Sequence, residues 1–129
     1  MREIKFRAWN KQRKEIFKVA SIDFKEKKVT LVNGIIRLSN VIFDDVKLMQ
    51  YTGLKDKNDK EVYEGDIVVL NNIKNDNMRI VRYEHGSYRL EGWGLREDLS
   101  NAEARFLEVV GNIYENKNLL EENNWVNTR

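Results

Sequence analysis

Apolar and polar residues alternate along most of this chain. In "EIKFRAW", Ile4, Phe6 and Ala8 fall on one side of an extended backbone and Lys5 and Arg7 on the other, which is the period of a half-buried strand. Short segments with the same alternation, or rich in β-branched residues, recur at 15–24, 28–33, 35–38, 61–70, 78–84, 88–92 and 106–114. The pattern predicts a mainly β protein.

Glycine-marked turns join several of these segments. Asn33-Gly34 is expected to supply the positive φ angles of a tight hairpin turn, which returns Ile35–Leu38 onto the preceding strand, so the first third is predicted to be a β-meander. His85-Gly86-Ser87 predicts a second hairpin, with Gly86 in the unusual positive-φ conformation. Short strands in close succession favour a small barrel or paired sheets with minor helical pieces.

Two short helical segments are expected near the end of the chain. Ser100 and Glu103 have the spacing of a capping box, which predicts a helical turn over 101–105. "ENKNLLEENNW" predicts a short helix that starts near Asn116 and packs Leu119 and Leu120.

Composition narrows the possible functions. The 129 residues suffice for one domain or two very small ones. The sequence contains no Cys, which excludes disulfides, thiol catalysis and cysteine-ligated metal sites. "MREIKFRAWN" has charges within its apolar residues, unlike a signal peptide or a membrane span. We therefore expect a cytoplasmic protein without membrane contact.

Charge is distributed unevenly along the sequence. Residues 1–28 carry ten Lys or Arg against four Asp or Glu, a balance of +6, whereas residues 29–129 carry thirteen against seventeen, a balance of −4. Such a separation can steer a polyanion to one face, or let the basic region of one subunit dock on the acidic body of another. It is also what short strands produce when they simply direct Lys and Arg to solvent.

Catalytic motifs are absent from the sequence. His85 is the only histidine, and its place in a predicted turn indicates a solvated residue. "DKNDKE" superficially resembles a calcium loop, with Asp56, Asn58 and Lys60 at alternating positions, but Glu61 stands where that loop needs Gly and Ile67 where it needs Glu. We therefore predict no catalytic residue, no metal ligand and no cofactor, and we expect a protein that is not an enzyme.

A basic stretch with one tryptophan is the candidate contact surface. Lys and Arg neutralise phosphates and an exposed indole can stack on a base, so the stretch is a candidate for contact with nucleic acid or with a protein partner. Its residues are Arg2, Lys5, Arg7, Trp9, Lys11, Arg13 and Lys14. The alternative is that Trp9 only packs at the end of a strand.

Three segments resemble the signature segments of the YopX family of phage and prophage proteins, in the same order. They are "KFRAW", "MQYTGLKDKNDKEVYEGDIV" and "VVGNIYENKNLLE". The chain departs from the family pattern in having Asn58-Asp59 where Asn-Gly is usual, and Lys117 where Pro is usual. Asp adopts the left-handed conformation less readily than Gly, so the first departure affects the turn.

The alternation predicts an N-terminal β-meander over 1–50, and the resemblance implies that an SH3-like barrel with a short C-terminal helix follows over 51–129. The two parts form either separate domains or one continuous globular unit. The resemblance also implies a phage-derived gene acting in the cytoplasm of a bacterial host. It implies no established activity, so no catalytic residue carries over, and small barrels of this kind serve many functions.

The connector between the two predicted parts, residues 49–68, contains the expected structural turns. Gly53, Asn58 and Asp59 are predicted at its sharp points, Gly65 where a side chain would be strained, and Asp66 where it accepts backbone hydrogen bonds. The side chains predicted to be buried in the strand that follows are Val62, Ile67 and Val69.

Three hypotheses of function follow. The first is an accessory protein that acts through contacts with a host or phage protein, or as a homo-oligomer in which basic and acidic regions meet. The alternative is nucleic-acid binding by the basic N-terminal strand. A weaker alternative is a metal-dependent phosphate-processing enzyme that uses the carboxylates of the connector.

Overall fold

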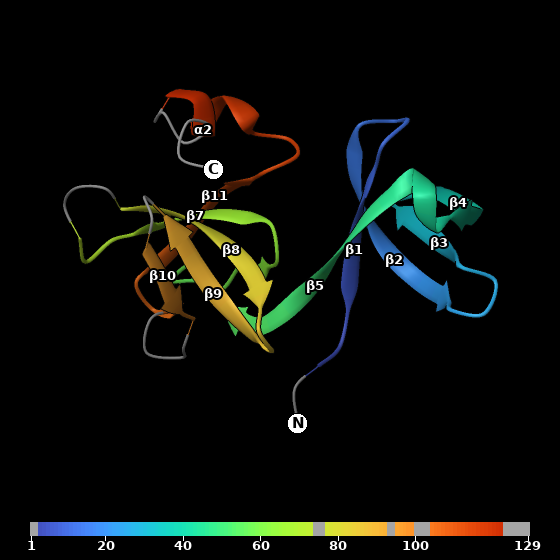
Figure 1. The fold of residues 1–129 in the computed structure, drawn as a ribbon. Coiled ribbons are helices and arrows are strands. Elements are labelled where there is room, and N and C mark those ends of the chain that lie inside the picture. Colours follow the sequence, from blue (N-terminus) through green and yellow to red (C-terminus); the bar gives the residue numbers. More distant parts are fainter. Residues whose placement is uncertain (1–2, 74–76, 93–94, 100–103, 123–129) are drawn as a thin grey trace. The chain divides into compact units, whose positions relative to one another are not determined.

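The computed structural model describes residues 3–73, 77–92, 95–99 and 104–122 (Figure 1). Contacts divide the chain into two compact units, Met1–Tyr51 and Thr52–Arg129.

The N-terminal unit is an antiparallel sheet whose first four strands form a meander. Its elements are β1 (Phe6–Asn10), β2 (Glu15–Asp23), β3 (Lys28–Asn33), β4 (Ile36–Ile42), a 3₁₀ turn η1 (Phe43–Asp45) and the start of β5 (Val46–Lys55). The strand order is β4-β3-β2-β1-β5, and the short β6 (Glu61–Tyr63) pairs with the outer side of β5. This part of the predicted mainly β fold is confirmed.

One face of this sheet forms the core of the N-terminal unit. Its buried residues, each at most 5% exposed, are Ala8, Phe17, Val29, Leu31 and Val46. The alternation predicted from the sequence holds at Ala8, but it fails at Ile4, which is 72% exposed, and Phe6 is only half-buried. Ile4 precedes the first residue of β1, so no neighbouring strand covers it.

The C-terminal unit contains a five-stranded antiparallel sheet. Its strands are β7 (Asp66–Leu70), β8 (Met78–Glu84), β9 (Ser87–Gly92), β10 (Leu95–Asp98) and β11 (Leu107–Asn112). The order is β10-β9-β8-β7-β11, so the last strand returns beside the first, as in an SH3-like barrel. The chain then forms the helix α2 (Lys117–Glu122).

Strand β7 is buried on both faces, which corrects one prediction. Ile67 packs in one cluster with Ile80 and Leu120, whereas Val68 lies in another with Leu90. Val69, which was predicted to be buried, is half-buried, and Val68 is fully buried instead. The prediction assumed a single apolar face, but apolar residues cover both faces of this strand.

The two hairpins predicted from Gly-marked turns both have two-residue loops. Asn33 pairs with Ile36, so the first loop is Gly34-Ile35, and only Gly34 has a positive φ, +61°. The prediction that Asn33 would also adopt this conformation is wrong, because a turn with Gly at its first central position needs only that residue. In the second hairpin Glu84 pairs with Ser87, which leaves His85 and Gly86 as the loop, at φ +51° and +82°.

The helical segments agree with the sequence where the structure describes them. Helix α2 begins at Lys117, one residue after the predicted start, and buries Leu120. Most of the helical turn predicted over 101–105 lies outside the described residues, although Ala104 is helical and buried. Within the described part of the chain, no helix has the length and apolar character needed to cross a membrane.

We predict different effects for the same truncation at two neighbouring residues of β7. Val68→Ala should lower the free energy of unfolding by about 2 kcal/mol, because it removes two fully buried methyl groups and leaves a cavity. Val69→Ala should lower it by less than about 1 kcal/mol, because that side chain is only half-buried. Urea unfolding of both variants measures the difference, and equal losses would contradict the two-sided burial.

Candidate functional site

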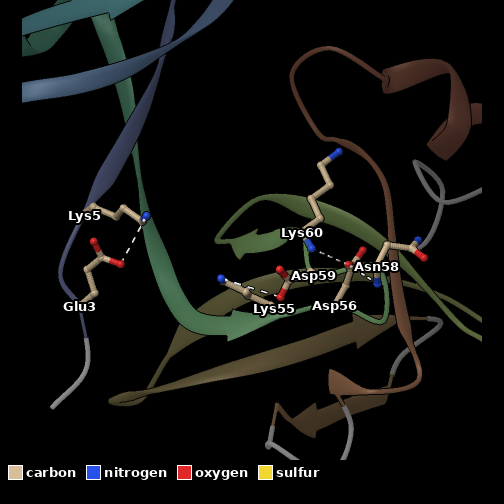
Figure 2. Close-up of polar contacts among 7 residues, drawn as sticks. All are labelled: Glu3, Lys5, Lys55, Asp56, Asn58, Asp59 and Lys60. Atoms are coloured by element: carbon tan, nitrogen blue, oxygen red, sulfur yellow. Dashed lines mark hydrogen bonds and ion pairs between the residues drawn. The ribbon is translucent and has the colours of Figure 1, made fainter.

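The connector between β5 and β6 folds around the carboxylate of Asp56, which is 6% exposed. Its Oδ1 accepts hydrogen bonds from the backbone N–H groups of Asn58 (2.8 Å) and Lys60 (2.9 Å), as Figure 2 shows. Its Oδ2 accepts one from the N–H of Val109 in β11, at 2.9 Å. The carboxylate therefore closes the turn and joins it to the last strand of the C-terminal unit.

Main-chain hydrogen bonds tighten the same turn. The N–H of Asp56 donates to the carbonyl of Lys60 (2.8 Å), and that of Asp59 donates to the carbonyl of Asp56 (3.0 Å). Asp59 takes the left-handed conformation, φ +65°, and so does Gly53, φ +89°. Asn58 does not have a positive φ; its N–H is held by Asp56 instead.

The turn between β6 and β7 is organised by Gly65 and Asp66. Gly65 has φ +88°, its N–H donates to the carbonyl of Val81 (2.8 Å), and its carbonyl accepts from Ile113 (2.9 Å). Asp66 is 1% exposed, and its Oδ2 accepts the N–H of Tyr63 at 2.8 Å. Both residues therefore hold neighbouring strands together.

The connector offers little side-chain chemistry beyond these bonds. A shallow, open hollow beside it is lined in part by Lys55, Lys57 and Arg105. Lys55 lies 3.8 Å from Asp59 (Figure 2), and Lys57 lies 3.5 Å from a carboxylate oxygen of Glu108. Among the residues that the structure describes, no three His, Cys, Asp or Glu side chains are grouped to hold a metal ion. These observations give the phosphate-processing hypothesis no support.

The structure separates the basic residues singled out in the sequence into two groups. Lys5, Arg7 and Trp9 point to the same side of the chain, because side chains two apart in a strand share a face. Lys5 also lies 3.4 Å from Glu3 (Figure 2), and its Nζ lies 5.1 Å from the centre of the Tyr51 ring. Arg2 lies outside the described residues.

The second group lies in the turn between β1 and β2. Asn10 organises this turn, since its Oδ1 accepts the N–H groups of Gln12 and Arg13, both at 3.0 Å. Lys11 Nζ donates to the carbonyl of Asp44 at 2.8 Å, and Arg13 lies 3.7 Å from Glu15. Lys14 has φ +55°. These cations therefore lie in a turn rather than in the strand that carries Trp9.

Strand pairing adds three cations that sequence reasoning did not single out. Lys18 of β2 lies opposite Arg7, and Lys47 of β5 lies opposite Trp9. Arg37 of β4 joins the same row through Val32, which pairs with both Lys18 and Arg37. We call these residues the basic face: Arg7, Trp9, Lys18, Arg37 and Lys47.

The basic face is opposite the core of the N-terminal unit. Ala8 and Phe17, which pair with each other between these rows, point into the core. Lys18, Arg37 and Lys47 are exposed and, within the described residues, take part in no ion pair. Their grouping depends on strand register, so the linear sequence carries no signal for it.

A second surface feature is apolar and follows the free edge of the sheet. Strand β4 is the outermost strand, and Ile35, Ile36 and Ile42 are 103%, 38% and 45% exposed. Phe24 is 70% exposed and its ring lies 6.3 Å from that of Phe43, the residue after Ile42. We call these residues the β4 edge: Phe24, Ile35, Ile36 and Ile42.

The acidic C-terminal unit pairs many of its charges internally. Thr52–Arg129 carries eleven Lys or Arg against fifteen Asp or Glu, whereas Met1–Tyr51 carries twelve against six. Across β8, β9 and β10, Arg79 lies 3.1 Å from Glu97, Arg82 lies 3.4 Å from Glu91, and Arg89 lies 3.2 Å from Asp98. Several acidic groups are therefore already neutralised within the unit.

Comparisons with known proteins agree with the resemblance seen in the sequence. The family described as YopX protein matches residues 5–121. A crystal structure of protein EF1440 from Enterococcus faecalis is similar, with 29% identity, a TM-score of 0.65, and coverage of 93% of this chain and 99% of that one. A comparison with curated proteins found no match.

A crystal structure of protein yopX from Bacillus subtilis is also similar, with 14% identity and a TM-score of 0.56. The match covers 93% of this chain and 97% of that one. At this identity the likeness supports the fold alone.

Replacing the Asp56 carboxylate tests its structural role. Asp56→Asn should lower the free energy of unfolding by about 1–3 kcal/mol, because an amide NH₂ cannot accept at both positions and a backbone N–H loses its partner. The matched change Asp59→Asn, at a side chain that is 86% exposed, should stay within about 0.5 kcal/mol of the parent protein. Equal urea unfolding curves for the two variants would contradict this role.

Proposed function

The chain belongs to the YopX family, and we propose that it is a binding protein without catalytic activity that acts through protein–protein contacts. We further propose an accessory role for a protein of phage or prophage origin in the bacterial cytoplasm. The positions of the most deeply buried carboxylates support a non-catalytic role, since Asp56 and Asp66 accept hydrogen bonds from backbone N–H groups.

The β4 edge is the single observation that carries the protein–protein proposal. Among the described residues, four of the eight exposed large hydrophobic side chains belong to it. These side chains lie at the two ends of β4, and exposed apolar residues along a sheet edge, together with the unpaired N–H and C=O groups of an edge strand, form a surface that another strand can bind. Burying the four side chains against a partner would remove apolar surface from water.

The proposed partner is a second copy of the chain. Two copies of one edge strand can meet around a two-fold axis, which makes an apolar edge complementary to itself. The pairing would be short, because β4 contains a bulge: Leu38 and Val41 pair with Leu31 and Val29, and Asn40 has φ +58°. Side-chain burial rather than a long hydrogen-bonded ladder would then supply most of the stability, so we expect a weak, reversible dimer.

The salt dependence of self-association distinguishes this apolar dimer from the arrangement expected from the sequence, in which the basic region of one subunit docks on the acidic region of another. Two N-terminal units that each carry a balance of +6 repel one another, and salt screens that repulsion. An apolar dimer should therefore persist or strengthen as salt rises, whereas docking of opposite charges should weaken.

We predict that sedimentation equilibrium will detect self-association at tens of micromolar protein in both low and high salt. Ile36→Lys and Ile42→Lys should each shift the protein to monomer, because they place a charge on the β4 edge. The control Ile4→Lys makes the same change at a residue that is 72% exposed but lies away from β4, and it should leave the dimer intact.

Two results would overturn the proposed dimer. One is a strictly monomeric parent protein at these concentrations. The other is an oligomer that dissociates as salt rises and is unaffected by Ile36→Lys and Ile42→Lys, which would indicate charge docking instead.

A further inference from the structure

We propose that the basic face of the N-terminal unit binds single-stranded nucleic acid, with Lys18, Arg37 and Lys47 contacting phosphates beside the ring of Trp9. This inference rests on a different surface property from the protein–protein contacts proposed above, and it does not require them. It follows from the strand register, the exposure of the three cations and the place of the aromatic ring.

The register places the cations in two adjoining rows. One row crosses four strands, from Arg37 on β4 through Val32 and Lys18 to Arg7 on β1. The next row holds Trp9 and Lys47. Neighbouring strands are about 4.8 Å apart, so Arg37 and Arg7 mark the ends of a track of roughly 15 Å across the sheet. A track of this kind suits a flexible chain of phosphates.

Within the described residues, Lys18, Arg37 and Lys47 take part in no ion pair that would stabilise the fold. Arg7 and Lys18 lie directly opposite one another on adjacent strands, an arrangement of like charges that destabilises a sheet. In the C-terminal unit, by contrast, arginines on β8 and β9 lie beside carboxylates at 3.1–3.4 Å. An external polyanion would relieve the repulsion on the basic face and add favourable ion pairs.

Trp9 favours a single strand over a duplex. Its side chain is half-buried on the same face as the cations, between Ile16 of β2 and Lys47 of β5. An aromatic ring on a basic sheet face can stack on an unpaired base, whose face is accessible. In a duplex the bases are stacked on one another, and sequence is read through the grooves by an inserted helix or ribbon.

The test is fluorescence anisotropy with a labelled oligothymidine of about 16 nucleotides, a length that one small sheet can occupy. The parent protein should bind at low salt and release the oligonucleotide as salt rises. The triple variant Lys18→Gln, Arg37→Gln, Lys47→Gln should weaken binding at least about tenfold. It should also reduce the slope of log K against log salt by about 2, since each phosphate contact contributes roughly 0.7.

A matched control removes the same charge elsewhere in the N-terminal unit. Lys14→Gln, Lys25→Gln, Lys27→Gln changes three exposed cations that lie in turns rather than on the basic face. This variant should keep most of the affinity, and circular dichroism of both variants should match the parent protein. Trp9→Phe keeps an aromatic ring and should bind better than Trp9→Ala.

Several outcomes would overturn the inference. They are the absence of oligonucleotide binding at low salt, equal losses in the two triple variants, and equal binding of Trp9→Phe and Trp9→Ala. Equal affinity for a duplex of the same length would overturn the assignment to single strands. Competition by polyglutamate as effective as that by unlabelled oligonucleotide would overturn the assignment to nucleic acid.

Discussion

The carboxylate of Asp56 makes the contact on which much of the C-terminal unit depends. It holds two N–H groups of its own turn and the N–H of Val109, which lies 53 residues further along the chain. Lys57 adds a main-chain bond to Leu107 at the start of β11. The connector is thus fastened to the strand that returns beside β7 and completes the five-stranded sheet.

Buried Asn and Asp residues repeat this device at other turns. Asn10 holds the turn after β1, and Asn112 Oδ1 accepts the N–H groups of Tyr114 (3.0 Å) and Glu115 (2.9 Å) after β11. Asn116 Oδ1 accepts the N–H of Asn112 at 3.0 Å, and it lies so close to Gly111 that a Cβ added at Gly111 would come within 2.5 Å of this oxygen. In this protein these Asn and Asp side chains bind chiefly to backbone N–H groups of nearby turns. The candidate binding surfaces therefore lie on the N-terminal unit.

Much of the fold could be predicted from the sequence because the patterns that indicate strands and turns lie within short segments of the chain. Alternation identified the meander, and the Gly-marked turns located both hairpins. The predictions failed where packing or strand register determines which side chains are buried. Strand β7 is covered on both faces, which buries Val68 in place of Val69. The bond from Asp56 to Val109 likewise joins residues that no local pattern connects.

The candidate surfaces show the same division. Lys5, Arg7 and Trp9 were recognisable because they alternate along one strand, whereas Lys18, Arg37 and Lys47 join them only through pairing across four other strands. The β4 edge was equally hidden, since "GIIRLSNVIF" does not reveal that its strand is outermost. Composition signalled an excess of cations near the N-terminus, but not the face on which they gather.

The connector serves the fold, and we propose that the basic face of the N-terminal unit serves binding. Lysine acetylation footprinting with mass spectrometry, with and without a bound single-stranded oligonucleotide, tests it most directly. Lys18 and Lys47 should become protected, while Lys55, Lys57 and Lys60 of the connector should react as before. Protection of the connector lysines with unchanged reactivity at Lys18 and Lys47 would contradict it.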